Sequence, residues 1–306
     1  MNVREWALPV YTILLQIAIG TLLCLWILRF FGGKKIGHEA MDQIVRDPLL
    51  IILVTIFLGM IGAHFHLSRP YLSFLSIRNF QSSWLSREIV FTLIFFVLNL
   101  FLCYLQWFHE GSWKLRSTLG WVAIADGFVT VYCMGSIYLL PAQAAWDTPE
   151  TIFSYYGSML LLGVMALAAI LIMDLRFNEV REKQTLTERA KIVKQAVKGL
   201  AVVGGVVLIP VIVLNLSHLQ WLRTGAPLAQ TSYELLIDLY TPLLVARFVM
   251  LLAGVGILVF SVFRMNRKKM TIQELFNPVY LSCLMVIVGE VLGRFLFYAA
   301  HIRTGL

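Results

Sequence analysis

The chain has 306 residues and a formal net charge of +8, and 59% of its residues are hydrophobic against 14% charged. Soluble proteins average roughly 45–50% apolar and about 25% charged residues. This composition excludes a disordered chain, a nucleic-acid binder and a soluble enzyme. With a mean hydropathy of +0.80, the protein is predicted to be an all-α integral membrane protein.

Eight transmembrane helices are predicted, since a spanning helix needs about 20 mostly apolar residues. No soluble domain or low-complexity linker interrupts them, so residues 1–306 are expected to form a single polytopic membrane domain. An even number of spans puts both termini on one side of the membrane. The predicted spans are 8–31, 48–67, 87–108, 118–140, 153–175, 197–217, 242–263 and 276–300.

The cations orient this bundle. The loops after the first, third, fifth and seventh spans carry 17 Lys and Arg residues, whereas the opposite side carries six. Lys and Arg accumulate on the cytoplasmic side of membrane proteins. The 17-cation side, with its basic loop 176–198, is therefore predicted to be cytoplasmic, and both termini are predicted to lie outside.

Three segments are expected as outward loops, at 68–86, 141–152 and 218–241. They are aromatic and weakly charged. Aromatic anchoring at the interface explains such residues, but the length of the loops favours a docking surface for another subunit.

Polar residues within or beside the spans are candidates for function, because an ionisable side chain costs about 2.5–3.5 kcal/mol to insert at a helix centre. Glu290 and Arg294 are four residues apart, so they share a helix face and can pair. At 1.5 Å per residue, seven polar residues from six spans are expected near the outer leaflet, where they would form a half-buried pocket for an amphipathic ligand. They are Gln16, His66, Glu88, Tyr138, Arg247, Glu290 and Arg294.

No metal or redox centre is expected in this protein. The four cysteines lie in apolar runs without a CxxC pair, so an iron–sulfur cluster is not predicted. His64 and His66 point to different sides of a helix, and the histidine spacing does not favour haem. P-loop, HExxH and GxSxG motifs are missing.

Several short motifs resemble one family. His66-Leu67-Ser68-Arg69-Pro70, then Ser-Ser-Trp-Leu-Ser-Arg-Glu-Ile at 82–89, resembles the membrane anchor subunit of bacterial dimethyl sulfoxide reductases. Gly-Glu-Val-Leu-Gly-Arg at 289–294 and Phe-Tyr-Ala-Ala-His at 297–301 are similar to the same family. The opening Glu-Trp-Ala-Leu-Pro with Gln16 in the first span looks similar too, as does Arg247 in the seventh, whereas the fourth to sixth spans match in hydropathy alone.

The resemblance implies a three-part enzyme of the bacterial inner membrane. A molybdopterin catalytic subunit and a subunit with four [4Fe–4S] clusters would sit on the outer face, and the anchor would oxidise menaquinol without haem. The family's quinol-site residues appear here as His66 and Glu88, with Arg69 nearby. A His and a Glu suit the task, because quinol oxidation releases protons that a positioned base must accept.

Three other interpretations stay open. The intramembrane charges are compatible with a secondary transporter, although no repeat relates the two halves of the sequence. The complex could also run in the quinone-reducing direction. A purely structural anchor would leave Glu88 and His66 unexplained. The substrate of the catalytic partner and the quinone type are not readable from the sequence.

Overall fold

The computed structural model describes residues 3–66, 75, 77–108, 112–181, 186–268 and 272–302. Within these ranges the protein has eight helices long and apolar enough to cross a membrane, as the sequence predicts. Their bounds are α1 Val3–Ile36, α2 His38–His66, α3 Trp84–Phe108, α4 Trp113–Ser136, α5 Pro149–Arg181, α6 Leu186–Thr224, α7 Pro227–Lys268 and α8 Phe276–Ala299; a short 3-10 helix, η2 Ile272–Leu275, precedes α8.

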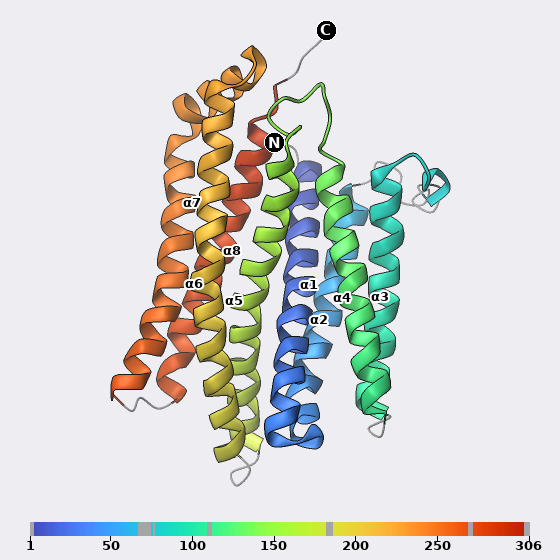
Figure 1. Ribbon diagram of the computed structural model, residues 1–306, viewed down its shortest axis with the longest axis vertical. Helices are drawn as coiled ribbons and strands as arrows, with labels where there is room; N and C mark the ends of the chain where they lie inside the picture. Colours follow the sequence, from blue (N-terminus) through green and yellow to red (C-terminus); the bar gives the residue numbers. More distant parts are fainter. Residues whose placement is uncertain are drawn as a thin grey trace.

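The helices run roughly along one common axis, and the start of α1 and the end of α8 lie at the same end of the bundle (Figure 1). We call this the terminal end. The opposite end, where α1, α3, α5 and α7 finish, is called the basic end, because the sequence concentrates its cations there. The assignment of the basic end to the cytoplasm stays a prediction.

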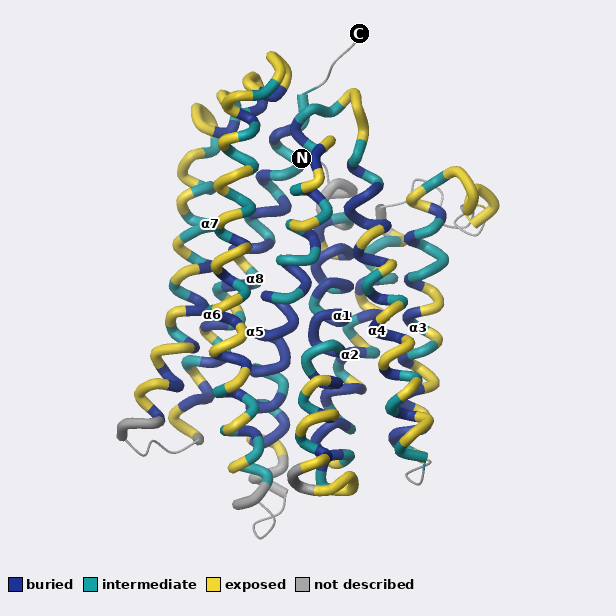
Figure 2. The backbone as a smooth tube through the Cα atoms, in the orientation of Figure 1, coloured by how far each residue is buried: buried dark blue, intermediate teal, exposed yellow. Residues whose placement is uncertain are grey.

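Helices α1 and α5 form the centre of the bundle. Their most apolar windows are 72% and 78% buried, against 28% for α6 and 22% for α7, and Figure 2 shows the same contrast. Helices α2 and α4 pack against one side of this pair, with α3 outside them, and α6 and α8 pack against α5, with α7 outside them. Apolar side chains exposed on the outer helices suit contact with lipid.

A glycine pair lets α1 and α5 approach to backbone contact. A Cβ on Gly20 would overlap the carbonyl oxygen of Met159, and a Cβ on Gly163 would overlap the backbone of Gly20. Small residues at helix crossings drive association within membranes, where lipid is as apolar as the side chains and close packing supplies the attraction.

Segment 218–241, predicted as a loop, is helical instead. It continues α6 to Thr224 and opens α7 at Pro227, so only Gly225 and Ala226 separate the helices. Proline suits the first helical position because its φ is already set and no N–H is needed there. The helical hairpin is held by a small apolar core that includes Leu222, Ala229 and Leu236.

The predicted basic loop 176–198 is also mostly helical. Helix α5 extends to Arg181 and α6 begins at Leu186. The extension is tied down by an ion pair in which Arg189 Nη2 lies 2.6 Å from Asp174 Oδ2. A charge pattern typical of a solvated loop therefore lies on two helix ends that are joined by this ion pair.

The lengths of α6 and α7 exceed what a membrane requires. At 1.5 Å per residue, 39 and 42 residues span roughly 58 and 63 Å, whereas the hydrocarbon core is about 30 Å thick. Their connection extends beyond the ends of α3 and α4 at the terminal end (Figure 1).

Gly163→Ala is expected to force α1 and α5 apart and to destabilise the fold by about 1–3 kcal/mol or more, as overpacking does. The matched control is Gly199→Ala, because a Cβ at Gly199 meets nothing within 4 Å. The control should be neutral or slightly stabilising, since alanine favours a helix. Thermal unfolding of both variants in detergent measures the difference. Equal midpoints would contradict a packed glycine contact.

Reporter fusions test the orientation. A fusion within 264–271 at the basic end is expected to report cytoplasm, and one within 225–232 at the α6–α7 connection is expected to report the outside, because of the cation distribution. The reverse pattern would overturn the assignment of both faces.

Candidate functional site

Helix α8 carries a buried acid and a buried base near the terminal end. Glu290 and Arg294 are 2% and 4% exposed, and their spacing of four residues puts them on one helix face. This spacing also allows them to pair with each other. Each instead finds its hydrogen-bond partner on another helix.

Arg294 joins three helices. Its Nη2 donates to Gln16 Oε1 on α1 at 2.9 Å, and its Cζ lies 3.5 Å from the ring centroid of Tyr155 on α5. Gln16 Nε2 in turn donates to the Tyr155 carbonyl at 2.8 Å. The guanidinium is therefore held by an amide and an aromatic face, which both favour a desolvated cation.

Glu290 is held by a hydroxyl. Ser158 Oγ on α5 donates to Glu290 Oε2 at 2.7 Å, and Glu290 Oε1 is buried without a hydrogen-bond partner among the described residues. Arg247 on α7 interacts electrostatically with both Glu290 and Arg294. Its guanidinium occupies the space left by Gly293, where a Cβ would come within 2.6 Å of Cζ.

A small cavity adjoins these side chains between α5, α6, α7 and α8. Its volume is about 70 Å³, enough for several waters at about 10–15 Å³ each. Buried polar atoms without a partner among the described residues, including Glu290 Oε1, Arg247 Nε and His218 Nδ1, lie on residues that line it. Such atoms are normally satisfied by water.

Tyr138 extends the same network toward the membrane boundary. Its hydroxyl shares a hydrogen bond with the Tyr298 hydroxyl at 2.7 Å, and its ring lies 6.0 Å from that of Tyr155. Beside it, Trp146 Nε1 donates to the Phe297 carbonyl at 2.8 Å. These contacts fix the end of α8 against the 137–148 connection.

Glu88 occupies a separate place, on α3. It is 2% exposed and lies beside Tyr11 on α1, whose hydroxyl shares a hydrogen bond with Thr92 Oγ1 at 2.9 Å. Tyr11 and Gln16 are five residues apart, so α1 presents them in different directions. An ionised Glu88 would nevertheless lie within electrostatic range of Tyr138, Tyr155 and Tyr298.

The position of Glu88 within its helix differs from the prediction. The third span is expected to begin at 87, but α3 begins at Trp84, so Glu88 lies beyond the first turn. The stabilisation of acids by a helix dipole falls off within that turn. A simple helix-start role therefore does not account for this buried carboxyl group.

Two predicted site residues lie at or beyond the end of α2. His66 is the last residue of this helix, and its side chain lies outside the described part of the protein. Arg69 lies outside the described residues altogether. Of the eight candidates, Gln16, Tyr138, Arg247, Glu290 and Arg294 belong to the α1–α5–α7–α8 network, and Glu88 lies across α1 from it.

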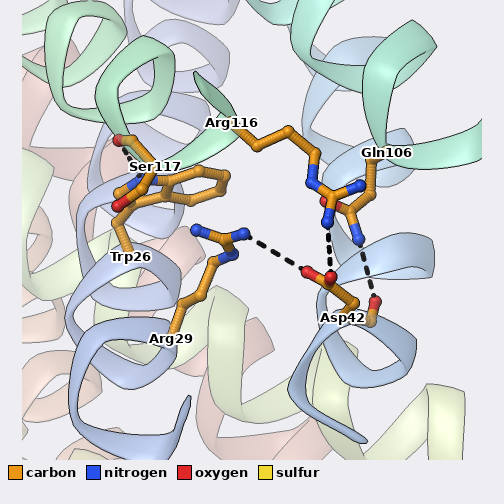
Figure 3. Close-up of polar contacts among 6 residues, drawn as sticks. All are labelled: Trp26, Arg29, Asp42, Gln106, Arg116 and Ser117. Carbon is orange, nitrogen blue, oxygen red and sulfur yellow. Dashed lines mark hydrogen bonds and ion pairs between the residues drawn. The ribbon is translucent and has the colours of Figure 1, made fainter. Parts of the chain in front are cut away.

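A buried charge cluster at the basic end is absent from the sequence-based prediction. The sequence-based charge count includes Arg29 and Arg116 among the loop cations. In the structure they are 1% and 0% exposed, and they share one carboxylate (Figure 3). Arg29 Nη2 lies 3.3 Å from Asp42 Oδ1, and Arg116 Nη2 lies 2.6 Å from Asp42 Oδ2. Gln106 Nε2 on α3 donates to the Asp42 carbonyl at 3.1 Å.

The sequence does contain one indication that Arg29 is buried, namely the tryptophans near it. Its Cζ lies 3.4 Å from the ring centroid of Trp113 and 5.1 Å from that of Trp26. Trp26 fits because Gly120 has no side chain; a Cβ there would overlap the indole. An Arg three residues after a Trp at a span end favours a packed cation over a solvated one.

The fold and the site identify the protein as a multi-pass helical membrane protein with a buried polar network near one end. A family model described as "DMSO reductase anchor subunit (DmsC)" matches residues 1–300. The protein belongs to this family.

Two curated relatives extend over nearly the whole sequence. The YnfH subunit of an anaerobic dimethyl sulfoxide reductase of Escherichia coli (strain K12) is 27% identical, covering 99% of this protein and 97% of the relative. The C subunit of the anaerobic dimethyl sulfoxide reductase of Haemophilus influenzae is 25% identical, covering 100% of this protein and 99% of the relative. The similarity therefore includes the fourth to sixth helices, where the motifs are weak.

A double-mutant cycle tests the contact between α1 and α8. Gln16→Ala and Arg294→Ala should each destabilise the protein. The effect of the double substitution should differ from the sum of the two single effects by about 0.5–3 kcal/mol, as it does for residues in contact. Unfolding midpoints in detergent measure all four proteins.

Ser282→Ala provides the control for this cycle. Ser282 lies 12 residues before Arg294 on α8 and donates to the Gly254 carbonyl at 2.6 Å, so its effect should add to that of Arg294→Ala within about 0.5 kcal/mol. Equal coupling in both cycles would show that Gln16 and Arg294 are not specifically linked.

Proposed function

We propose that this anchor subunit binds menaquinol, oxidises it and passes the electrons to an iron–sulfur partner subunit in a bacterial inner membrane. The partner would carry four [4Fe–4S] clusters and deliver electrons to a molybdopterin catalytic subunit, as the family resemblance implies. Membership of the anchor-subunit family favours this role over a transporter.

One observation carries the proposal, namely the burial of the Glu88 carboxyl group beside Tyr11 and Thr92. A carboxylate removed from water is costly unless it is compensated or has a task. Its place near the terminal end, one turn into α3, is within reach of a ligand that enters from the lipid. Helix α2 also ends there, at His66.

The proton chemistry follows from the balance of the reaction. Oxidation of a quinol to a quinone removes two electrons and two protons. Glu88, as a carboxylate, accepts a hydroxyl proton of the quinol while the electrons leave toward the iron–sulfur partner. His66 is the second base, and Arg69 holds developing negative charge on the quinol oxygen by a charge-assisted hydrogen bond.

The remaining candidates act as positioning residues in this proposal. The cavity beside Glu290 measures about 70 Å³, far below the roughly 300 Å³ of a small-molecule pocket, so we assign the quinol ring to the Glu88 side of α1. Gln16, Tyr138, Arg247, Glu290 and Arg294 then hold α1 against α5 and α8. This keeps Tyr11 in contact with Glu88.

The partner subunits are proposed to dock at the terminal end. The α6–α7 hairpin there stands beyond the expected membrane boundary and carries exposed apolar residues such as Leu228, Ile237 and Leu239. Exposed apolar groups on a rigid element outside the membrane favour a protein contact.

Glu88→Gln tests the catalytic role. Gln preserves size but cannot accept the proton, so quinol-dependent turnover of the complex should fall about 10²–10⁴-fold, the usual contribution of acid–base catalysis. Reduction driven by a dye that feeds the partner directly should be unchanged, because packing and docking are preserved.

The matched control is Glu39→Gln, an exposed acid in the first turn of α2, which should retain both activities. If Glu88→Gln retained the activity of the unaltered protein in both assays, the proposal would be refuted. Loss of both would instead assign Glu88 to assembly.

A further inference from the structure

A cavity with basic side chains on its wall lies at the basic end, and neither the quinol proposal nor the docking proposal uses it. Its volume is about 160 Å³, and it lies between the last turns of α1, the start of α2 and the start of α4. The lining includes three basic side chains, Arg29, Lys34 and His38, and, among the described residues, no carboxylate.

The charge around this cavity is unbalanced. Asp42 pairs with Arg29 and Arg116 but does not line the cavity, whereas Arg29 and Lys34 do. Arg29 is 1% exposed, and its Nε has no hydrogen-bond partner in the described ranges. Lys34 adds a further cation at the cavity wall, while the neighbouring Glu39 is exposed and not part of the lining. Two cationic side chains on a wall without a described carboxylate favour an anionic ligand.

The rings of His38 and Trp113 form one wall of the cavity. The His38 and Trp113 rings lie 3.9 Å apart, and Arg29 stacks on the same indole. Gly33 permits this approach, because a Cβ there would come within 3.1 Å of His38 and 3.2 Å of Trp113.

An apolar groove adjoins the cavity along α1. It has a volume of about 310 Å³ and is lined by α1, α5 and α6, including Ile27, Phe31 and Gly199. Ile27, Phe30, Phe31 and Lys34 follow one another at helical spacing along α1. Ile27, Phe30 and Phe31 are 42%, 46% and 61% exposed. This ridge separates the polar cavity, lined by Phe30 and Lys34, from the apolar groove.

We propose that the cavity and the groove together bind one anionic phospholipid. The phosphodiester headgroup occupies the polar cavity against Lys34, His38 and Arg29, and one acyl tail passes over the ridge into the groove. Basic pockets between transmembrane helices recognise anionic headgroups in this way. The lipid would place a negative charge opposite Arg29 and Lys34 and cover the seam between α1 and α6. This site is independent of the quinol chemistry.

Lipid titration of the delipidated full-length protein in detergent tests the headgroup site. Phosphatidylglycerol should raise the unfolding temperature in a saturable manner, whereas phosphatidylcholine and inorganic phosphate should not. Lys34→Gln should weaken the apparent affinity about fivefold, the effect of one cation near an anionic headgroup. Lys114→Gln is the control, because this exposed lysine follows Trp113 but does not line the cavity.

Gly199→Leu tests the groove separately. A Cβ at Gly199 meets nothing within 4 Å, so the variant should fold while its side chain fills the acyl site and weakens phosphatidylglycerol binding. Gly256→Leu is the matched control, since Gly256 is equally open and does not line the groove.

Three results would overturn the proposal. Equal protection by phosphatidylcholine would mean that the headgroup charge is not recognised, and equal protection by inorganic phosphate would identify a free anion as the ligand. Identical affinities for Lys34→Gln and Lys114→Gln would place the lipid elsewhere.

Discussion

The contact between Gly20 and Gly163 is the constraint on which the rest of the bundle depends. It brings α1 and α5 together at backbone distance, and the other helices pack around this pair. The hydrogen bond from Gln16 to the Tyr155 carbonyl and the stacking of Arg294 on Tyr155 both need α1 and α5 at this spacing. A larger residue at the crossing would therefore disturb the polar network even though neither glycine belongs to it.

The two ends of the bundle compensate buried charge by different means. At the terminal end Arg294 and Glu290 are separated, and each is held by uncharged partners, an amide and a ring for one and a hydroxyl for the other. At the basic end one carboxylate serves two arginines. The second group is a structural clamp that joins α1, α2 and α4 through ion pairs.

The sequence predicts the eight spans because their hydropathy is strong, and it predicts which helices carry Gln16, Arg247, Glu290 and Arg294. It does not predict the partners. The i, i+4 spacing suggests that Glu290 binds Arg294, but the orientation of α1 and α5 decides that Arg294 meets Gln16 and Glu290 meets Ser158. Likewise, a count of cations cannot distinguish buried Arg29 from a solvated lysine, because burial depends on Asp42, Trp113 and Gly120 from other helices. The helical state of 218–241 escapes hydropathy, since its core forms only after the hairpin folds.

The hydrogen bond between Gln16 and Arg294 has a consequence for the order in which the protein assembles. Its partners lie 278 residues apart, whereas Arg29 and Asp42 are 13 apart. At about 5–20 residues per second, the ribosome completes the second pair within a few seconds and the first only after tens of seconds. The clamp at the basic end can therefore form while later helices are still being inserted. The network at the terminal end closes last, so a polypeptide that stops before α8 has the clamp at the basic end but lacks the contacts of Arg294 and Glu290 with α1 and α5.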